Sequence, residues 1–134
     1  MKPDNASGKR VLVVEDEAVI SRVCARVLTT EGLEVDIANS GLVAKDMVKK
    51  KEYDLCLIDI RTPGMNGIQL HHYLREEHPE LADKVIFTTG DMLNSDIKTF
   101  LMDSNRPHLP KPFTPDELRA VIREALSKLD CLIH

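Results

Sequence analysis

The chain has 134 residues, of which 43% are hydrophobic and 30% charged, and this balance predicts one globular domain with a sizeable core. Its longest unbroken apolar runs, Val11–Val14 and Leu55–Ile58, are far shorter than the roughly 18 residues of a membrane span, so no membrane contact is expected. A formal net charge of −4 argues against a domain that binds nucleic acid directly.

The opening segment, residues 1–8, is polar and has no apolar stretch of the kind found in a signal peptide, so we expect a disordered lead-in. Three cysteines, Cys24, Cys56 and Cys131, are widely spaced and form no C-x-x-C pair. They indicate neither a disulfide framework nor a zinc site, and they favour a cytoplasmic protein.

Short apolar runs alternate along the chain with apolar residues at helical spacing, which predicts five strand–helix units. The first helix has its apolar stripe from Val19 to Leu28 and ends at Gly32. The last helix opens with Thr114 to Glu117, a capping sequence, and its stripe runs to Leu129, before a short tail at 130–134. The strands are predicted at residues 10–15, 33–38, 54–59, 84–89 and 107–110.

Persistent strand–helix alternation predicts an α/β fold, a doubly wound five-stranded parallel sheet with helices on both faces. Strands one, three and four are continuously apolar, which is typical of central strands. Strand two alternates, and strand five is bracketed by Pro107 and Pro110, so both are expected at the edges. The resulting order is 2-1-3-4-5, and ligands should bind where it reverses, between strands one and three.

Polar side chains gather at the carboxyl ends of these strands. Glu15 and Asp16 end strand one and Asp59 ends strand three, so three like charges should lie close together unless a cation or a proton relieves them. Carboxylates, carbonyls and water are the ligands that Mg²⁺ prefers. Lys111 and Thr89 follow strands five and four on the same rim and can contact phosphate oxygens. Together these groups predict a site for an aspartyl-phosphate.

Four motifs in this order and spacing resemble the receiver domain of response regulators of bacterial two-component systems, from about residue 9 to 129. They are Val11–Glu17, Leu57–Gly67, Thr88-Thr89-Gly90 and Lys111-Pro112-Phe113. The resemblance implies a flavodoxin-like receiver fold and a phosphoacceptor that signals through a protein-interaction surface. It also implies a cis peptide between Lys111 and Pro112.

The resemblance gives each site residue a role. Asp59 matches the phosphoacceptor, Asp16 the direct carboxylate ligand of Mg²⁺, Glu15 the neighbouring acidic position and Arg61 the backbone-carbonyl ligand. In the same way Thr89 and Lys111 match the switch hydroxyl and the lysine that contacts the phosphoryl group. The donor would be a histidine kinase or a histidine phosphotransfer protein, and the output a downstream protein partner.

Two positions depart from the family pattern. Glu15 replaces the more usual Asp and so places the carboxylate on a longer arm. His108 occupies the place of the aromatic switch residue on strand five. A neutral imidazole can fill space vacated by Thr89 and would make switching sensitive to pH; the alternative is an ordinary exposed histidine.

Two oppositely charged residues flank the site symmetrically. Arg61 lies two residues beyond Asp59, and Asp91 lies two beyond Thr89. Their ion pair would form a gate over the phosphoryl group that hinders the hydrolytic water and lengthens the phosphorylated lifetime. Two independently solvated loop charges are the alternative.

Histidines 71, 72 and 78 do not converge as ligands on a helix and are expected to be solvated. Two rival functions remain as alternatives: a Mg²⁺-dependent aspartyl phosphatase, disfavoured because Asp59 is followed by Ile60-Arg61-Thr62, and a receiver-shaped interaction module without phosphorylation. We therefore expect no enzyme that turns over a free substrate. The chain is either a stand-alone regulator or the receiver of a hybrid histidine kinase.

Overall fold

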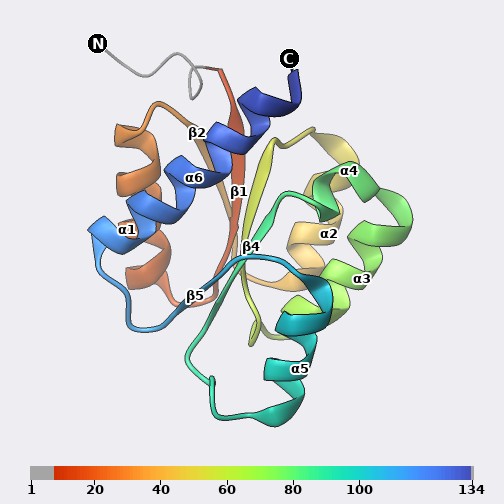
Figure 1. Cartoon of the computed structure of the whole chain (residues 1–134). Coiled ribbons are helices and arrows are strands. Elements are labelled where there is room, and N and C mark those ends of the chain that lie inside the picture. The colour runs from red at the N-terminus through yellow and green to blue at the C-terminus, as the bar shows by residue number, and fades with distance from the viewer. Residues whose placement is uncertain (1–7, 134) are drawn as a thin grey trace.

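The structure is a computed structural model that describes residues 8–133, with side chains up to Leu129. Its centre is a five-stranded parallel sheet in the order β2-β1-β3-β4-β5 (Figure 1). This confirms the predicted fold class and strand order. The strands are β1 (Arg10–Val14), β2 (Glu34–Ala38), β3 (Leu55–Asp59), β4 (Val85–Thr89) and β5 (His108–Pro110).

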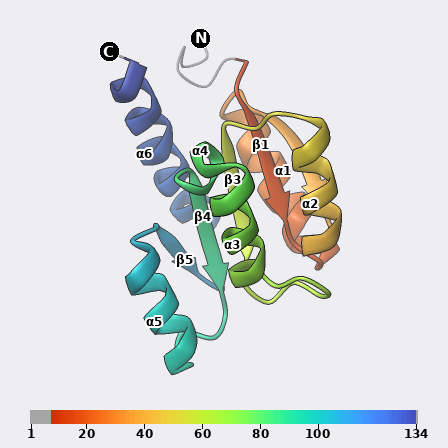
Figure 2. The same ribbon diagram turned by 90° about the vertical axis from the view of Figure 1, so that its right-hand side faces the viewer.

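Helices cover both faces of the sheet, as Figure 2 shows from the side. One face carries α1 and α6, and the other carries α2, α3 and α5. A single helical turn, α4, precedes β4 and was not predicted, because four residues are too few for a periodic pattern. The helices are α1 (Ala18–Thr30), α2 (Gly41–Lys50), α3 (Gly67–Glu77), α4 (Pro79–Ala82), α5 (Ser95–Ser104) and α6 (Pro115–Ile133).

Strand alternation divides the core between the two faces. In β1, Val11 and Val13 pack against α1 and α6, whereas Leu12 and Val14 pack on the opposite side. All four are almost fully buried, which explains why the central strands read as unbroken apolar runs. Cys24 and Cys56 are buried free thiols within this core, and Cys131 lies outside the described side chains.

Side-chain caps fix where the helices begin. The predicted cap of α6 is present, since the Thr114 hydroxyl accepts from the Glu117 N–H at 3.1 Å and the Glu117 carboxylate accepts from the Thr114 N–H at 2.8 Å. At the start of α3, Gly67 packs so closely that an added Cβ would lie 2.7 Å from the Ile60 Cα. Its N–H also donates to the Ile60 carbonyl at 2.8 Å, which holds the loop after β3 against the end of that strand.

The chain ends differ slightly from the sequence expectation. Residues 1–7 of the predicted lead-in lie outside the described residues. Helix α6 continues through Ile133 and therefore includes most of the segment predicted as a tail. Among the described helices, none combines the length and apolar character needed to span a membrane.

Candidate functional site

Asp59 is the last residue of β3 and lies at the carboxyl end of the sheet, where the strand order reverses between β1 and β3. It is only 5% exposed. Its Oδ1 accepts a hydrogen bond from the Arg61 N–H at 3.1 Å, and its Oδ2 accepts one from the Lys111 Nζ at 2.9 Å. Both carboxylate oxygens are thus oriented by the surrounding chain.

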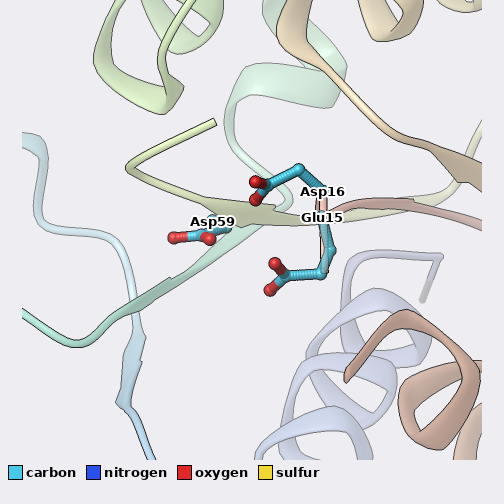
Figure 3. A group of neighbouring side chains, drawn as sticks. All are labelled: Glu15, Asp16 and Asp59. Atoms are coloured by element: carbon cyan, nitrogen blue, oxygen red, sulfur yellow. The ribbon is translucent and has the colours of Figure 1, made fainter. Parts of the chain in front are cut away.

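The acidic residues expected at this place do gather together. One carboxylate oxygen from each of Glu15, Asp16 and Asp59 lies within 4.8 Å of the others. Figure 3 shows the three side chains around a shared space at the ends of β1 and β3. Carboxylate oxygens at this spacing suit a hard divalent cation such as Mg²⁺, which takes oxygen ligands and relieves the repulsion between them.

Lys111 supplies the positive charge of the site. Its Nζ lies 2.7 Å from Glu15 Oε1, 2.9 Å from Asp59 Oδ2 and 3.9 Å from the exposed Glu17 carboxylate. Burial lowers the pKa of Lys111, but its hydrogen bonds to Glu15 and Asp59 outweigh that effect and raise the pKa above its ordinary value. Lys111 therefore stays protonated at neutral pH.

For Glu15, unlike Lys111, burial has a larger effect on the pKa than the hydrogen bonds do. Burial raises the pKa of its carboxyl group, and the nearby Asp59 charge adds to this, although the hydrogen bonds from Lys111 and from the Glu17 N–H act to lower it. Burial is thus the main reason that the pKa of Glu15 is raised, whereas the pKa of Lys111 is raised by its hydrogen bonds to two carboxylates. The site carries excess negative charge, which favours a bound cation.

Thr89 ends β4 and is fully buried. Its hydroxyl oxygen accepts a hydrogen bond from the Asp91 N–H at 3.1 Å. Like Phe87 two residues earlier, it lies on the face of the sheet that α2, α3 and α5 cover. The carbonyl of Thr89 also accepts from the Lys111 N–H at 2.8 Å, which ties the lysine to the end of β4.

Arg61 and Asp91 meet at the mouth of the site. The Arg61 guanidinium forms an ion pair with the Asp91 carboxylate, and both side chains are partly exposed to solvent. The structure therefore brings together the two loop charges that sequence spacing singled out. The resemblance-based cis peptide between Lys111 and Pro112 is present as well.

The histidines differ from one another in their surroundings. His108 is exposed on edge strand β5, where it is the register partner of Phe87. His71, expected to be solvated, is instead 3% exposed, and that expectation was wrong. It belongs to the buried stripe Gly67, Leu70, His71 and Leu74 of α3, whose i, i+3, i+4, i+7 spacing would have placed it on the apolar face.

The sequence of residues 11–123 matches the profile of the response regulator receiver domain. The chain belongs to this family. A receiver domain is the phosphoacceptor part of a two-component response regulator and acts in phosphorelay signal transduction, and the cluster of carboxylates at the carboxyl end of the sheet is consistent with this family.

Two relatives contain a region similar to this chain within a longer protein. The chain is 35% identical over 115 residues to transcription factor SKN7 of Saccharomyces cerevisiae, covering 86% of this chain and 18% of SKN7. It is 31% identical over 122 residues to the DNA-binding response regulator MtrA of Mycobacterium tuberculosis, covering 91% of this chain and 52% of MtrA. The receiver thus spans about half, or less, of the length of these relatives.

Solved structures agree with the fold. A CheY-like receiver domain protein of Methanospirillum hungatei has a TM-score of 0.82 to this receiver at 28% identity, covering 91% of this chain and 96% of that one. A putative response regulator of Chloroflexus aurantiacus has a TM-score of 0.78 at 26% identity, covering 89% of this chain and 98% of that one. The five-stranded architecture of this receiver is therefore shared across almost the whole length of both.

Proposed function

We propose that Asp59 is the phosphoacceptor of this receiver and takes its phosphoryl group from a histidine of a partner kinase or phosphotransfer protein. The observation that supports this most strongly is the placement of the Asp59 carboxylate. It is nearly buried, lies at the strand-order reversal, and has an ammonium at 2.9 Å and two further carboxylates beside it. A surface carboxylate that merely ends a strand needs none of these neighbours.

The transfer needs only modest covalent chemistry. An Asp59 carboxylate oxygen forms a bond to phosphorus as the phosphorus–nitrogen bond of the donor phosphohistidine breaks, and the departing imidazole nitrogen takes up a proton. The Lys111 ammonium stays beside Asp59 Oδ2 and stabilises the negative charge that arrives on the phosphoryl oxygens. The Arg61 N–H holds Oδ1 and so orients the carboxylate plane.

Mg²⁺ would be held by Asp16, Asp59 and the backbone carbonyl of Arg61, with Glu15 as the neighbouring carboxylate. When bound, the ion neutralises charge on the carboxylates and on the phosphoryl group. The fit rests on the all-oxygen donor set and on the excess negative charge of the site.

Thr89 and His108 would convert phosphorylation into a signal. Thr89 ends β4, the strand next to β3, and its hydroxyl would donate to a new phosphoryl group on Asp59 by moving toward the end of β3. That movement would leave space next to Phe87, the register partner of His108 on β5. The output would be a change on the surface of α5, β5 and α6.

Arg61 and Asp91 would act as a gate on the lifetime of the phosphoryl group. Their ion pair connects the loops that follow β3 and β4. Arg61 lies two residues after Asp59, the last residue of β3, and Asp91 lies two residues after Thr89, the last residue of β4. An exposed pair contributes only about 0 to 1 kcal/mol to stability. Its effect would be to obstruct the line along which water attacks the phosphorus.

We place the receiver domain at residues 9–129 and expect it to work in the cytoplasm through protein contacts, without direct contact to nucleic acid or membrane. The net charge of −4 supports this expectation for the domain itself. The receiver is a signalling domain; we propose that it does not turn over a free substrate but only assists its own phosphorylation and dephosphorylation.

The direct test is incubation of the purified protein with Mg²⁺ and acetyl phosphate, followed by intact-mass measurement. The wild type should gain one phosphoryl group, and Asp59→Asn should gain none. Asp46→Asn, an exposed carboxylate on α2, serves as the control and should be modified like the wild type. Equal modification of Asp59→Asn would refute the assignment. Repeated hydrolysis of a phosphate monoester supplied as a free substrate would favour the phosphatase alternative.

A further inference from the structure

A cavity of about 480 Å³ lies at the amino ends of β3, β4 and β5, at the edge of the sheet opposite to Asp59. Its lining includes Leu55, the first residue of β3, Lys84, which precedes β4, and Arg106 and Pro107, which precede β5. Helix α6 supplies a second wall. The volume falls within the range of about 300 to 1,000 Å³ that small-molecule sites occupy. The proposed phosphoacceptor chemistry uses none of these lining residues.

Arg106 is held in a fixed position at this cavity. Its Nε donates to the carbonyl of Val85, the first residue of β4, at 3.0 Å, and its backbone N–H donates to the Ser104 hydroxyl at 3.4 Å. Within the described part of the chain, its two Nη groups have no hydrogen-bond partner and the guanidinium forms no ion pair. Arg106 therefore brings anchored but unused N–H donors to the cavity lining.

The charge of Arg106 is only partly compensated by the protein. Burial lowers the pKa of the guanidinium and the nearby Arg75 charge adds to this, although the Asp83 charge opposes both. An arginine stays protonated at neutral pH, so the half-buried side chain carries its positive charge without an ion-pair partner. An anion beside the guanidinium would supply the missing compensation.

The other charged residues around the cavity leave a balance of one positive charge. Lys84 and Lys128 line it together with Arg106, and the acids in the lining are Asp83 and Glu124. Glu124 and Lys128 pair with each other along α6 at 3.7 Å. Lys84 forms no ion pair with a side chain that the structure describes. A singly charged anion would neutralise this balance, whereas a dianion would exceed it.

The α6 wall of the cavity is apolar. Val121 and Ala125 lie one helical turn apart and are only partly buried against the core, so both keep apolar surface on the cavity side. Leu55 and Pro107 add apolar surface from the sheet side. A ligand that fills this cavity therefore needs an apolar body in addition to one negative charge.

We propose that this cavity binds a small organic carboxylate with an apolar body, whose carboxylate contacts the Arg106 guanidinium and whose body lies against α6. The planar guanidinium carries parallel N–H donors that match the two oxygens of a carboxylate. Lys84 adds a second positive charge to the same lining. The site lies away from Asp59, and its occupation does not depend on phosphorylation.

Cinnamate is a suitable probe, because it joins one carboxylate to an aromatic ring. Titrated into the full chain and followed by ¹H–¹⁵N NMR, it should shift the amides of Leu55, Lys84, Arg106 and the adjoining part of α6, with a dissociation constant of about 1 mM or lower. Cinnamamide lacks the charge and acetate lacks the ring, so each should bind at least about tenfold more weakly. Equal binding of cinnamate and cinnamamide would overturn the proposal, as would shifts confined to other faces of the molecule.

Two variants test the contacts separately. Arg106→Gln should weaken cinnamate binding at least about tenfold, because the guanidinium is lost. Lys84→Gln keeps the bond between Arg106 and the Val85 carbonyl and should weaken binding by about threefold, so it serves even if Arg106→Gln fails to fold. The matched control Arg26→Gln removes an exposed arginine from α1 and should bind like the wild type. Unchanged affinity in either cavity variant, or no saturable binding by the wild type at about 10 mM cinnamate, would refute the site.

Discussion

Lowering the pH from 7.5 to 5.5 should destabilise the folded protein through His71. This side chain is buried between α3, β4 and α5, where its ring stands edge-on to Phe87 and Phe100 at centroid distances of 5.3 and 5.7 Å. Its Nε2 lies 3.1 Å from the Ala82 carbonyl, so the neutral ring donates that hydrogen bond. A charged imidazolium in the same place would lack solvent.

The direction of this pH effect on stability follows from the pKa of His71. Burial lowers the pKa of His71, and the charges of Arg75 and Arg106 lower it further, whereas the Ala82 carbonyl and Asp83 partly oppose this. The unfolded chain takes up this proton near pH 6.5, and the folded protein takes it up only at lower pH. The contribution of the neutral His71 to the free energy of unfolding is therefore complete above about pH 6.5 and decreases as the pH falls below that value. For one proton the slope is at most about 1.4 kcal/mol per pH unit.

Urea unfolding between pH 7.5 and 5.5 measures this slope. His71→Gln should flatten it, even if the variant is less stable at every pH because ring packing is lost. His72→Gln is the matched control, because that neighbouring side chain is 77% exposed and pairs with Glu76 on the helix surface. It should keep the wild-type slope. Identical slopes in the wild type and His71→Gln would refute the reasoning.

Three further predictions concern the site. Mg²⁺ at about 100 times its dissociation constant should stabilise the fold by about 2.7 kcal/mol, measured as a higher melting temperature in thermal unfolding. Asp16→Asn should abolish this stabilisation by Mg²⁺. Stabilisation that persists in the variant would contradict the metal site. Arg61→Ala and Asp91→Ala should each speed dephosphorylation at fixed Mg²⁺, and the double variant little more than either; wild-type rates in both single variants would exclude the gate. Thr89→Ala should remain phosphorylatable but lose the phosphorylation-dependent amide shifts on α5, β5 and α6, and equal shifts in both proteins would count against the switch.

The sheet could be predicted from the sequence because its physical causes are local. Unbroken apolar runs mark strands that are buried on both faces, and prolines mark the β5 edge, so the strand order followed without contact information. The acidic cluster was predictable for the same reason. Carboxylates that end neighbouring parallel strands must lie at one edge of the sheet, and Glu15, Asp16 and Asp59 do.

Features that depend on side-chain reach could not be predicted. The sequence placed Glu15 and Lys111 on the same rim, but the 2.7 Å contact between them depends on rotamers and on two fixed backbones. The burial of His71 was not predicted, although the residue lies on the same helical stripe as Leu70 and Leu74. A polar side chain on an apolar stripe is buried when a partner such as the Ala82 carbonyl is present, and that partner comes from a different element.

The measurement that tests the central claim most directly is chemical mapping of the phosphorylated residue. Protein phosphorylated by acetyl phosphate with Mg²⁺ is reduced with borohydride, which converts an aspartyl-phosphate to homoserine, and is then digested and sequenced by mass spectrometry. We expect homoserine at position 59 and unmodified aspartate at position 16. Homoserine at any other carboxylate, or none at position 59 when the intact protein carries a phosphoryl group, would contradict the assignment of Asp59 as the phosphoacceptor.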